Sequence, residues 1–498
     1  MNNKQSKLKI KAGLIFLVVF LISVFFVYVT KEHARMETDL DEYMPKDHPA
    51  FVYSDQAEEW FNIKDGILIA VENKNGIYNS ISLQKVKDIT IGLQEMDEFE
   101  ENDVMSVYSA DNITGSEEGM EVEAFYLEVP ESKEDLAFLR ESVKSNDMVF
   151  GRFVSEDETV ALIVAGMSDT TFTTSFYNQI LDFAKSYEGN GDKIYVAGRP
   201  IVEGTMALLG PADMKRMVPI VLIVIALVLF FLLRSIRATT ATLLTVFISS
   251  IWTFGLMAAL RIPIFSVSTM IPVMLIAIGV AYGIYFYNHL KQFFTENPKS
   301  TRKDAVFYTL EVLWKPLLMA AFTTMIGFIS LLSSQVYPIK YFGIFTAFGI
   351  LTSFIMTLVF LPAFVILLGY RNKSQKNKLS KKEKLNNKFI KLTDVLFKRK
   401  KTIFLISLLI AIVSIIGIQK VWINSSFLDK FEKDSEIVLT DAFVNSKFGG
   451  TSTLNVILES KDVGVFKQPE NLRLIDDMQQ ETESLSKVGN SFSLTDYL

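Results

Sequence analysis

The polar groups that could do chemistry in this chain lie within long apolar runs. Four such runs, at about 238–260, 266–290, 316–334 and 341–368, contain no Asp or Glu. The hydroxyls that we single out there as candidates for ion coupling are those of Ser266, Ser268, Thr269, Tyr282, Thr323 and Thr324. A tyrosine has an unperturbed pKa of about 10, so Tyr282 does not readily exchange a proton near neutral pH.

Several other chemistries find no support in the sequence. The chain has no cysteine, which excludes disulfides, thiolate metal sites and a cysteine nucleophile. The three histidines, His33, His48 and His289, are isolated from one another, so no histidine metal site is predicted. There is no phosphate-binding Walker loop, zinc-protease spacing or nucleophile elbow. We therefore expect no enzyme activity, metal, cofactor or direct use of ATP.

The apolar runs predict a multi-pass α-helical membrane protein. A helix needs about 20 residues to cross roughly 30 Å of hydrocarbon. The four runs above meet that length, and three more, at 12–30, 217–233 and 402–418, bring the predicted spans to seven. A cleaved signal peptide is the alternative for the first run. That run is long and ends in Tyr28–Lys31 rather than in small residues, which favours an uncleaved helix.

Charge is divided unevenly along the chain. Residues 31–215 hold 15 Lys and Arg against 38 Asp and Glu, whereas residues 371–401 hold 13 against 2. Basic segments between spans stay on the cytoplasmic side. A basic tract could also bind nucleic acid, but its place between two spans favours a cytoplasmic linker. We predict a cytoplasmic N-terminus, an acidic domain outside the cell (inner or plasma) membrane, and no nucleic-acid partner.

The acidic region between the first two spans alternates strand and helix patterns. Strands are expected at 67–73, 104–110, 125–129, 159–166 and 193–198. Apolar residues at helical spacing predict helices near 83–96, 132–145 and 172–187. This alternation predicts an α+β domain of ferredoxin-like (split βαβ) units.

A second copy of this pattern begins after the seventh span. The segment LDEYMPKDHPA (40–50) matches LDKFEKDSEI (428–437), and ILIAVEN (67–73) matches LNVILES (454–460). GIYN (76–79) matches GVFK (464–467). Both copies would enter the membrane in the same direction, which is a parallel repeat of the kind found in transporters. We expect this chain to be the N-terminal portion of a longer protein, or a truncated product. The expected protein partners are a second copy of the chain, in a homo-oligomer, or the missing C-terminal half.

Four motifs carry a resemblance to a known family. They are IGVAYGIYFYN (278–288), AAFTTMIGFISLL (320–332), FGIFTAFGI (342–350) and LPAF (361–364). With GRPIVEG (198–204) and the order of spans, they resemble the resistance-nodulation-division (RND) superfamily, in its branch of MMPL-like and hydrophobe exporters, whose membrane block is similar to sterol-sensing domains. The resemblance implies that two halves form a transporter, that proton flow through the fourth span drives it, and that hydrophobic cargo leaves the membrane outward.

The fourth span departs from that resemblance at one position. Exporters of this type commonly carry Asp immediately before the motif's tyrosine, whereas this chain has Ala281 before Tyr282. A carboxylate in a bilayer costs about 2.5–3.5 kcal/mol and is usually retained for function. Three interpretations stay open: the other half holds the relay, this half couples to another ion through hydroxyls, or the block is a lipid-responsive module without ion flux. Gly279, Gly283 and Gly327 are predicted to serve helix packing.

These observations give one predicted organisation. The predicted divisions are a cytoplasmic N-terminus and first span (1–30), an extracytoplasmic α+β domain (31–215), a block of five spans (216–370), a basic linker (371–401), a seventh span (402–420) and the start of a second outer domain (421–498). The predicted function is ion-driven export of a lipid or other hydrophobic or amphiphilic molecule, with membrane lipids as partners. The alternative is a non-transporting lipid-binding or scaffold module of the sterol-sensing type.

Overall fold

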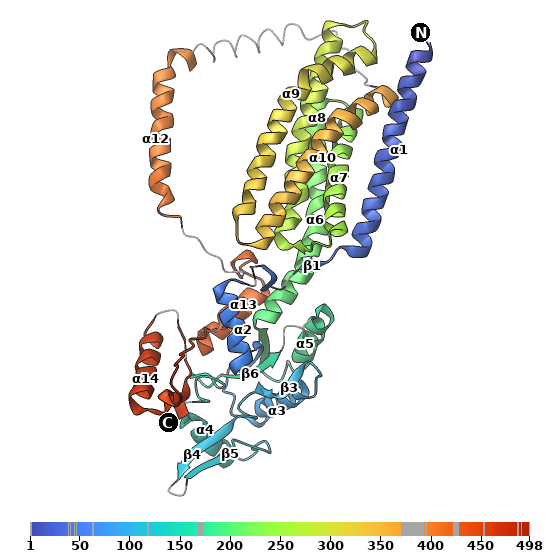
Figure 1. The fold of residues 1–498 in the computed structure, drawn as a ribbon. Coiled ribbons are helices and arrows are strands. Elements are labelled where there is room, and N and C mark those ends of the chain that lie inside the picture. The colour runs from blue at the N-terminus through green and yellow to red at the C-terminus, as the bar shows by residue number, and fades with distance from the viewer. Residues whose placement is uncertain are drawn as a thin grey trace.

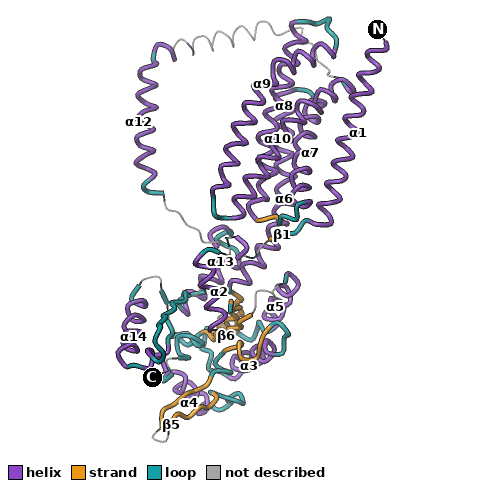
Figure 2. The backbone as a smooth tube through the Cα atoms, in the orientation of Figure 1, coloured by secondary structure: helices purple, strands orange, loops and turns teal. Residues whose placement is uncertain are grey.

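The structure is a computed structural model of the chain. It describes residues 2–37, 39, 41–43, 45, 47–61, 64–116, 119–146, 148–167, 173–369, 393, 396–421, 428–451, 454–485, 488–489 and 491–497. Long helices form a bundle, and a smaller region of helices and strands lies beyond one end of it (Figure 1). All the named strands lie at that end of the bundle or in the smaller region (Figure 2). Most of the predicted basic linker, 371–401, lies outside the described residues.

Seven of the described helices are long and apolar enough to cross a membrane. They are α1 (Asn2–His33), α6 (Arg199–Leu233), α7 (Ile236–Ala259), α8 (Ile271–Glu296), α9 (Arg302–Ile329), α10 (Tyr337–Leu368) and α12 (Lys400–Ile418). This confirms the prediction of a multi-pass helical membrane protein.

Three of these helices, α6, α8 and α9, extend well beyond the apolar runs that predicted them. The polar stretch after the fourth run is mostly helical, because α8 continues to Glu296 and α9 already begins at Arg302. The loop ends at Thr301, which is the N-cap residue of α9. The Thr301 side chain accepts from the Asp304 N–H, and the Asp304 side chain accepts from the Thr301 N–H. α6 begins at Arg199, so the predicted domain boundary at 215/216 falls inside one continuous helix.

Helices α1 and α7 to α10 pack into one apolar core. α1 lies against α7, where the Trp252 indole N–H donates to Ser23 Oγ at 3.0 Å. It also reaches α10, where the rings of Phe16 and Phe360 lie 4.6 Å apart. α12 contains no buried residue and stands apart from the bundle (Figure 1). An apolar helix with every face exposed is compatible with lipid and not with water.

The smaller region beyond the end of the bundle, which we call the outer region for its place relative to the bundle (Figure 1), is built on a four-stranded sheet. Its strands are β2 (Asp65–Asn73), β3 (Phe99–Met105), β6 (Val160–Met167) and β7 (Asp192–Ala197), in the order β3-β6-β2-β7 with every neighbouring pair antiparallel.

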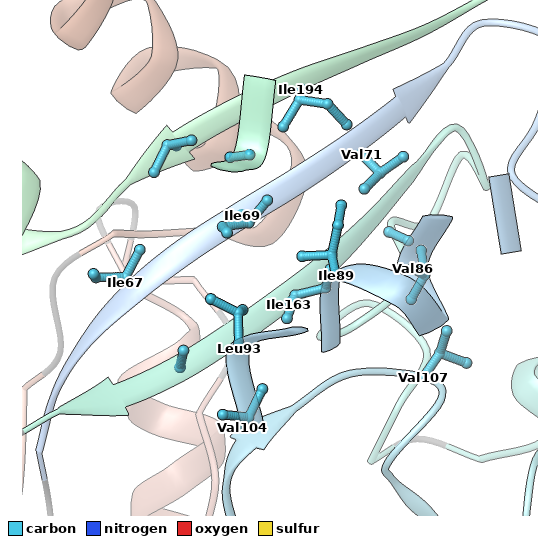
Figure 3. Close-up of a cluster of buried hydrophobic side chains, with 14 of the residues drawn as sticks. Ile67, Ile69, Val71, Val86, Ile89, Leu93, Val104, Val107, Ile163 and Ile194 are labelled. Atoms are coloured by element: carbon cyan, nitrogen blue, oxygen red, sulfur yellow. The ribbon is translucent and has the colours of Figure 1, made fainter. Parts of the chain in front are cut away.

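Two helices cover one face of this sheet. α3 (Ser80–Gln94) joins β2 to β3, and α5 (Thr174–Ser186) joins β6 to β7. Both bury their apolar stripes against the same side of β2, on which Ile67, Ile69 and Val71 are fully buried. Figure 3 shows these β2 residues beside the side chains of α3. The period-2 pattern of β2 and the helical spacing of α3 therefore meet in one core.

Two strand predictions are wrong: the one at 104–110 in its bounds, and the one at 125–129 altogether. β3 starts earlier, at Phe99, and ends at Met105, because a turn follows in which the Ala110 N–H donates to the Ser106 carbonyl at 2.8 Å. Residues 125–129 form no strand, and Tyr126 is buried with its hydroxyl on the Leu83 carbonyl at 3.2 Å. Residues 125–129 form a loop that packs against the core, and the apolar residues of this loop resemble those of a strand in sequence.

Two further helices and a hairpin also belong to the outer region. The hairpin, β4 (Asp111–Ser116) and β5 (Gly119–Ala124), was not predicted. α4 (Lys133–Lys144) starts at the cap Ser132, close to the predicted helix. α2 (Pro49–Phe61) follows α1.

The segment after α12 also contributes to the outer region. It adds α13 (Glu436–Phe448) and α14 (Pro469–Glu483). Residues 454–460, matched in sequence to β2, form no strand in the part of the chain that the structure describes.

α13 covers the sheet face opposite to α3 and α5. Val444 and Phe448 pack with Ala70 of β2, and the rings of Phe443 and Tyr195 stack at 4.0 Å. A helix that follows the seventh span therefore covers the second face of this sheet.

An ion pair at the end of α13 fixes this docking and predicts its pH dependence. Lys447 contacts Asp157 and also Thr159 Oγ1, at 3.2 Å. Burial raises the pKa of Asp157, but the hydrogen bonds from Lys447, Thr159 and Ser155 outweigh it and hold the pKa well below its usual value. A carboxylate whose pKa is lower in the folded protein than in the unfolded chain stabilises the folded state at pH values above the unfolded pKa of about 3.9. This stabilisation is lost as the pH falls below that value.

We expect Asp157→Asn to loosen α13 at neutral pH. Amide hydrogen exchange of α13, corrected for intrinsic rates, should rise in the variant at pH 7, whereas the wild type should stay protected down to about pH 4. Asp135→Asn, which alters an exposed carboxylate at the start of α4, is the control and should leave α13 unchanged. Equal exchange in all three proteins would contradict the ion pair's role.

Candidate functional site

Helix α7 carries a column of buried hydroxyls. Thr242, Thr245, Ser249 and Thr253 are fully buried and recur every three or four residues, which places them on one helix face. Three of them donate to backbone carbonyls within α7, at 2.6 to 2.8 Å. A membrane helix can bury such side chains because its own carbonyls accept their hydrogen bonds.

α10 presents a second set of hydroxyls to the same interior. Thr346, Ser353 and Thr357 are fully buried, and Thr357 donates to the Ser353 carbonyl at 2.8 Å. α7, α8 and α10 pack against one another pairwise, so both sets border α8. We call the combined group the hydroxyl seam. It consists of Thr242, Thr245, Ser249, Thr253, Tyr282, Thr346, Ser353 and Thr357.

Two glycines of α8 bring the helices close together along the seam. A Cβ at Gly279 would lie 2.6 Å from Ser353 Oγ and 2.7 Å from Val246 Cγ2. A Cβ at Gly283 would lie 2.5 Å from Thr242 Oγ1. Real Cβ atoms do not approach so closely, so only glycine permits this packing, as at other small-residue interfaces between membrane helices.

Several hydroxyls in the seam are not satisfied by the protein. Among the described residues, four seam hydroxyls are buried without a hydrogen-bond partner: Thr242, Tyr282, Thr346 and Ser353. The hydroxyls of Thr239 and Ser268 share this state. An unsatisfied buried polar group costs about 1–3 kcal/mol. Such oxygens are therefore available to bind an ion or a polar group in the core of the block.

Two neighbouring residues of the fourth-span motif, Ala281 and Tyr282, lie at different positions relative to the seam. Tyr282 lies on the buried face of α8, in one row with Gly279 and Phe286, and is 4% exposed. Ala281 is half-buried and falls outside that row. A carboxylate at position 281 would therefore lie beside the seam, on the flank of α8.

The other hydroxyls singled out from the sequence lie in two separate places. Ser266, Ser268 and Thr269 form the 3-10 turn that leads into α8, where Thr269 Oγ1 donates to the Ser266 carbonyl at 2.7 Å. Thr323 and Thr324 lie on α9, where they donate to carbonyls of their own helix at 2.8 to 3.0 Å, and Thr323 is exposed. The structure does not bring the two groups together.

The seam residues of α7 and α10 were missed from the sequence, although a signal existed. Thr239, Thr242, Thr245, Ser249 and Thr253 are spaced by three or four positions in the third span. A single hydroxyl in an apolar run is not diagnostic of a site, because it can bond to a carbonyl of its own helix, and only the spacing of several reveals the stripe.

The glycines of this block predict unequal responses to substitution. Gly283→Val should lower the stability of the bundle by about 1–3 kcal/mol, because the added side chain overlaps Thr242. Gly327→Val on α9 is the matched control, since a Cβ there meets no atom within 4 Å among the described residues and this glycine lies outside the packed surface. Thermal unfolding of both variants in detergent would measure the difference, and an equal shift would refute the packing assignment.

A shallow groove lies on the outside of the block. It has a volume of about 470 Å³ and is lined by Phe307, Leu310, Glu311, Trp314 and Leu358. Its lining comes from α9 and α10 and is apolar apart from one carboxylate. Such a surface suits an acyl chain better than a polar solute.

Comparison with known proteins agrees with this architecture. Over 162 residues the chain is 25% identical to the Niemann-Pick type C1-related protein of Toxoplasma gondii (strain ATCC 50611 / Me49). That alignment covers 30% of this chain and only 13% of the relative, so most of the relative's length has no counterpart in the alignment. Residues 79–399, which include strands β3, β6 and β7 of the sheet, the five spans α6 to α10 and the seam, match the MMPL family. The chain is therefore a multi-pass membrane protein of the MMPL family, in the branch of the RND superfamily whose membrane block is similar to sterol-sensing domains.

Proposed function

We propose that the chain is part of an RND-type transporter that exports a lipid or other hydrophobic or amphiphilic molecule, driven by an ion gradient. The observation that carries the proposal is the hydroxyl seam, a set of buried and partly unsatisfied oxygens in the core of a membrane block that is otherwise apolar. Membership of the MMPL family supports transport in general. Buried polar groups in a membrane are costly and usually serve function.

The coupling ion in this half is proposed to be an alkali cation such as Na⁺. Hydroxyls do not gain or lose protons near neutral pH, but their oxygens suit hard cations. Thr242, Tyr282 and Ser353 would supply such oxygens from three different helices. Of the three interpretations left open by Ala281, coupling through hydroxyls is the one that the seam favours.

Movement in the membrane would reach the outer sheet through α6. This helix has 35 residues and continues from the turn after β7 into the membrane. Gly198 makes the turn tight, with φ of +111° and with its Cα facing the Gly66 carbonyl of β2, where a Cβ would collide. The Tyr177 and Thr205 hydroxyls, 2.9 Å apart, fasten α5 to the same helix. A tilt of α6 would therefore be transmitted to the sheet.

The finer organisation is also proposed. The order β3-β6-β2-β7, with helices joining β2 to β3 and β6 to β7, supports a ferredoxin-like unit of two split βαβ motifs. The parallel repeat is supported by α2 and α13, of 13 residues each, and by α3 and α14, of 15 residues each.

Topology follows from charge. We place the acidic region 31–215 outside the cell membrane and the N-terminus and the basic tract 371–401 in the cytoplasm. The divisions predicted from sequence are retained as proposals on this basis.

Reconstitution distinguishes the proposal from its alternative. Full-length protein in liposomes that contain a fluorescent long-chain lipid should move the probe to one side under an imposed Na⁺ gradient. A non-transporting lipid-binding module would bind the probe and leave its distribution unchanged under Na⁺ or H⁺ gradients. Binding without movement would therefore reject transport and favour the sterol-sensing type of module.

A further inference from the structure

The segment between α1 and α2 lies where the bundle meets the outer region (Figure 1). We call its described residues, 36–37, 39 and 41–43, the strap. Strand β1 (Met36–Glu37) of the strap pairs in parallel with β8 (Ile264–Phe265), and the Ile264 N–H donates to the Arg35 carbonyl at 2.8 Å. β8 runs directly into the 3-10 turn that starts α8. The backbone of the strap is therefore bound to the segment that leads into the helix of Tyr282.

Aromatic rings hold the strap against a second membrane helix. Phe265 is 2% exposed, and its ring contacts both Tyr43 of the strap and Tyr341 of α10. The Tyr43 ring lies edge to face at 5.4 Å, and the Tyr341 ring is stacked at 5.9 Å. α8 and α10 both border the hydroxyl seam. A shift of α8 against α10 would therefore move the strap.

The strap is also held by Arg199, the first residue of α6. Its Nη2 lies 2.7 Å from Asp41 of the strap, and its Nη1 lies 2.9 Å from Asp65, the first residue of β2. Its Nε donates to Glu203, one turn further along α6, at 2.9 Å. One guanidinium thus ties the strap, the sheet and α6 together. A lysine, as a single point charge, lacks the planar fork that makes these three contacts.

The charges around Arg199 indicate that it serves this junction. A cation is disfavoured at the N-terminus of a helix, which carries a partial positive charge. Asp39 lies 3.9 Å from the same guanidinium, so four carboxylates share one cation: Asp39, Asp41, Asp65 and Glu203. Without the cation these carboxylates would repel one another, and the strap would lose its attachment to β2.

We propose that Arg199 is a positioning residue that couples the membrane block to the outer sheet through the strap. A shift of α8 moves β8, β8 moves β1, and Arg199 passes the movement to the start of β2. This route begins at the helix of Tyr282 and is separate from a tilt of α6. The inference rests on the transport function proposed above, but not on the identity of the ion or the cargo.

A double-substitution cycle tests the connection without measuring transport. Phe265→Leu removes the ring contacts of the strap and keeps an apolar side chain of similar reach. In full-length protein in lipid nanodiscs, this change should raise hydrogen exchange of the amides of residues 65–69 about tenfold. In the Arg199→Gln background the same change should add less than about twofold, because residues along one line of contacts act non-additively. Additive effects would overturn the inference, since the sheet would then sense the block by another route.

Transport separates a positioning role from a merely structural one. In liposomes with an imposed ion gradient, Arg199→Gln should reduce movement of the fluorescent lipid probe by at least about tenfold, as expected for the loss of coupling between two sites. Binding of the probe should stay within about twofold of the wild type. A variant whose outer region is simply disordered would lose binding and movement together.

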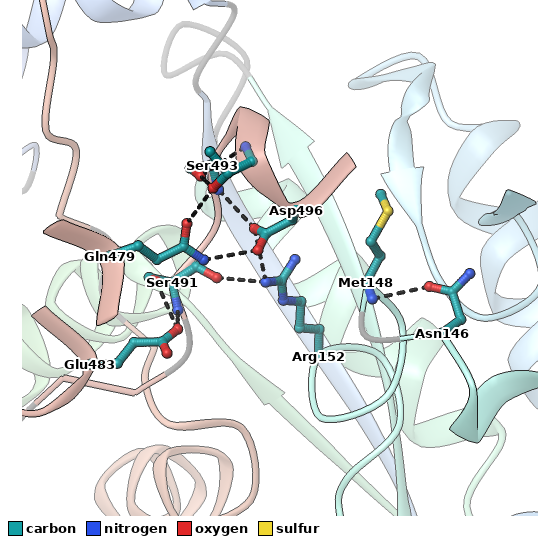
Figure 4. A network of polar contacts seen from close by, with 9 residues as sticks. Asn146, Met148, Arg152, Gln479, Glu483, Ser491, Ser493 and Asp496 are labelled. Atoms are coloured by element: carbon teal, nitrogen blue, oxygen red, sulfur yellow. Dashed lines mark hydrogen bonds and ion pairs between the residues drawn. The ribbon is translucent and has the colours of Figure 1, made fainter. Parts of the chain in front are cut away.

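Arg152→Gln is the matched control. Arg152 also joins two segments of the outer region, since it donates to the Ser491 carbonyl at 2.6 Å and pairs with Asp496 at 3.3 Å (Figure 4). Neither partner belongs to the strap or to the membrane block, so this variant should move the probe like the wild type.

Two transport results would overturn the inference. One is an equal loss of movement in the Arg199 and Arg152 variants, and the other is a loss of binding in Arg199→Gln that matches its loss of movement. A wild type that moves no probe would instead reject the transport proposal. The exchange cycle does not depend on flux, so it would still decide whether Arg199 connects the block to the sheet.

Discussion

Replacing Thr242 with Val and Ser353 with Ala is expected to reduce ion-driven lipid transport by about 10- to 100-fold. Each change removes one buried oxygen while largely preserving side-chain shape. An interaction with a charged group is worth about 1.5–3 kcal/mol, and 1.4 kcal/mol corresponds to a tenfold change. Because both hydroxyls lack a partner within the described protein, their removal should not destabilise the bundle.

The matched control for this pair is Thr323→Val on α9. Thr323 is also a hydroxyl in a membrane span, but it is exposed and bonded to carbonyls of its own helix. The control should transport like the wild type. If the double variant transports normally, the seam has no role in coupling, and if it unfolds more easily than the control, the seam is structural.

Lys85→Met should destabilise the outer unit by about 3–5 kcal/mol, the usual cost of leaving a buried charge unpaired. Lys85 Nζ lies 2.7 Å from Asp192, whose side chain is fully buried at the start of β7. Asn73, at the end of β2, and Ser82 on α3 donate to the other oxygen of that carboxylate, at 2.6 and 2.7 Å. One carboxylate thus ties two strands and a helix together.

Hydrogen exchange of the β2 and β7 amides in the full-length protein would measure this loss. Lys74→Met is the control, because Lys74 is exposed in the turn after β2 and its replacement should change stability by less than about 0.5 kcal/mol. Replacing both partners, with Lys85→Met and Asp192→Leu, should recover part of the loss, since no uncompensated charge then stays buried. Equal protection in the Lys85 and Lys74 variants would contradict the account of Asp192.

The membrane spans were predictable because length and hydropathy alone decide them. All seven runs became helices, and errors arose only at ends such as Arg302, where a capping residue sets the boundary. In the outer unit, β2, β6 and β7 were predictable from runs of β-branched and apolar residues. The structure of residues 125–129 was not predictable, because Tyr126 is buried although it lies in a loop. An apolar, buried residue does not by itself distinguish a loop from a strand.

The candidate site was harder to predict, for a physical reason. Tyr282 and the glycines of α8 stand in a recognisable motif, but the seam depends on which faces of α7 and α10 meet α8. The spacing of residues along a helix shows which of them share a face, but it does not show which neighbouring helix that face contacts. The docking of α13 on the sheet was likewise not predicted, since the sequence pattern of a helix does not say which surface the helix covers.

Sodium flux that depends on cargo tests the central claim most directly. Liposomes with the reconstituted wild type should take up radioactive Na⁺ when an exported lipid probe is present on the opposite side, and should take up little without it. The Thr242→Val, Ser353→Ala protein should lose this cargo-dependent uptake and Thr323→Val should keep it. Sodium uptake that ignores the probe, or that is the same in the seam variant and the wild type, would contradict ion-coupled transport through the seam.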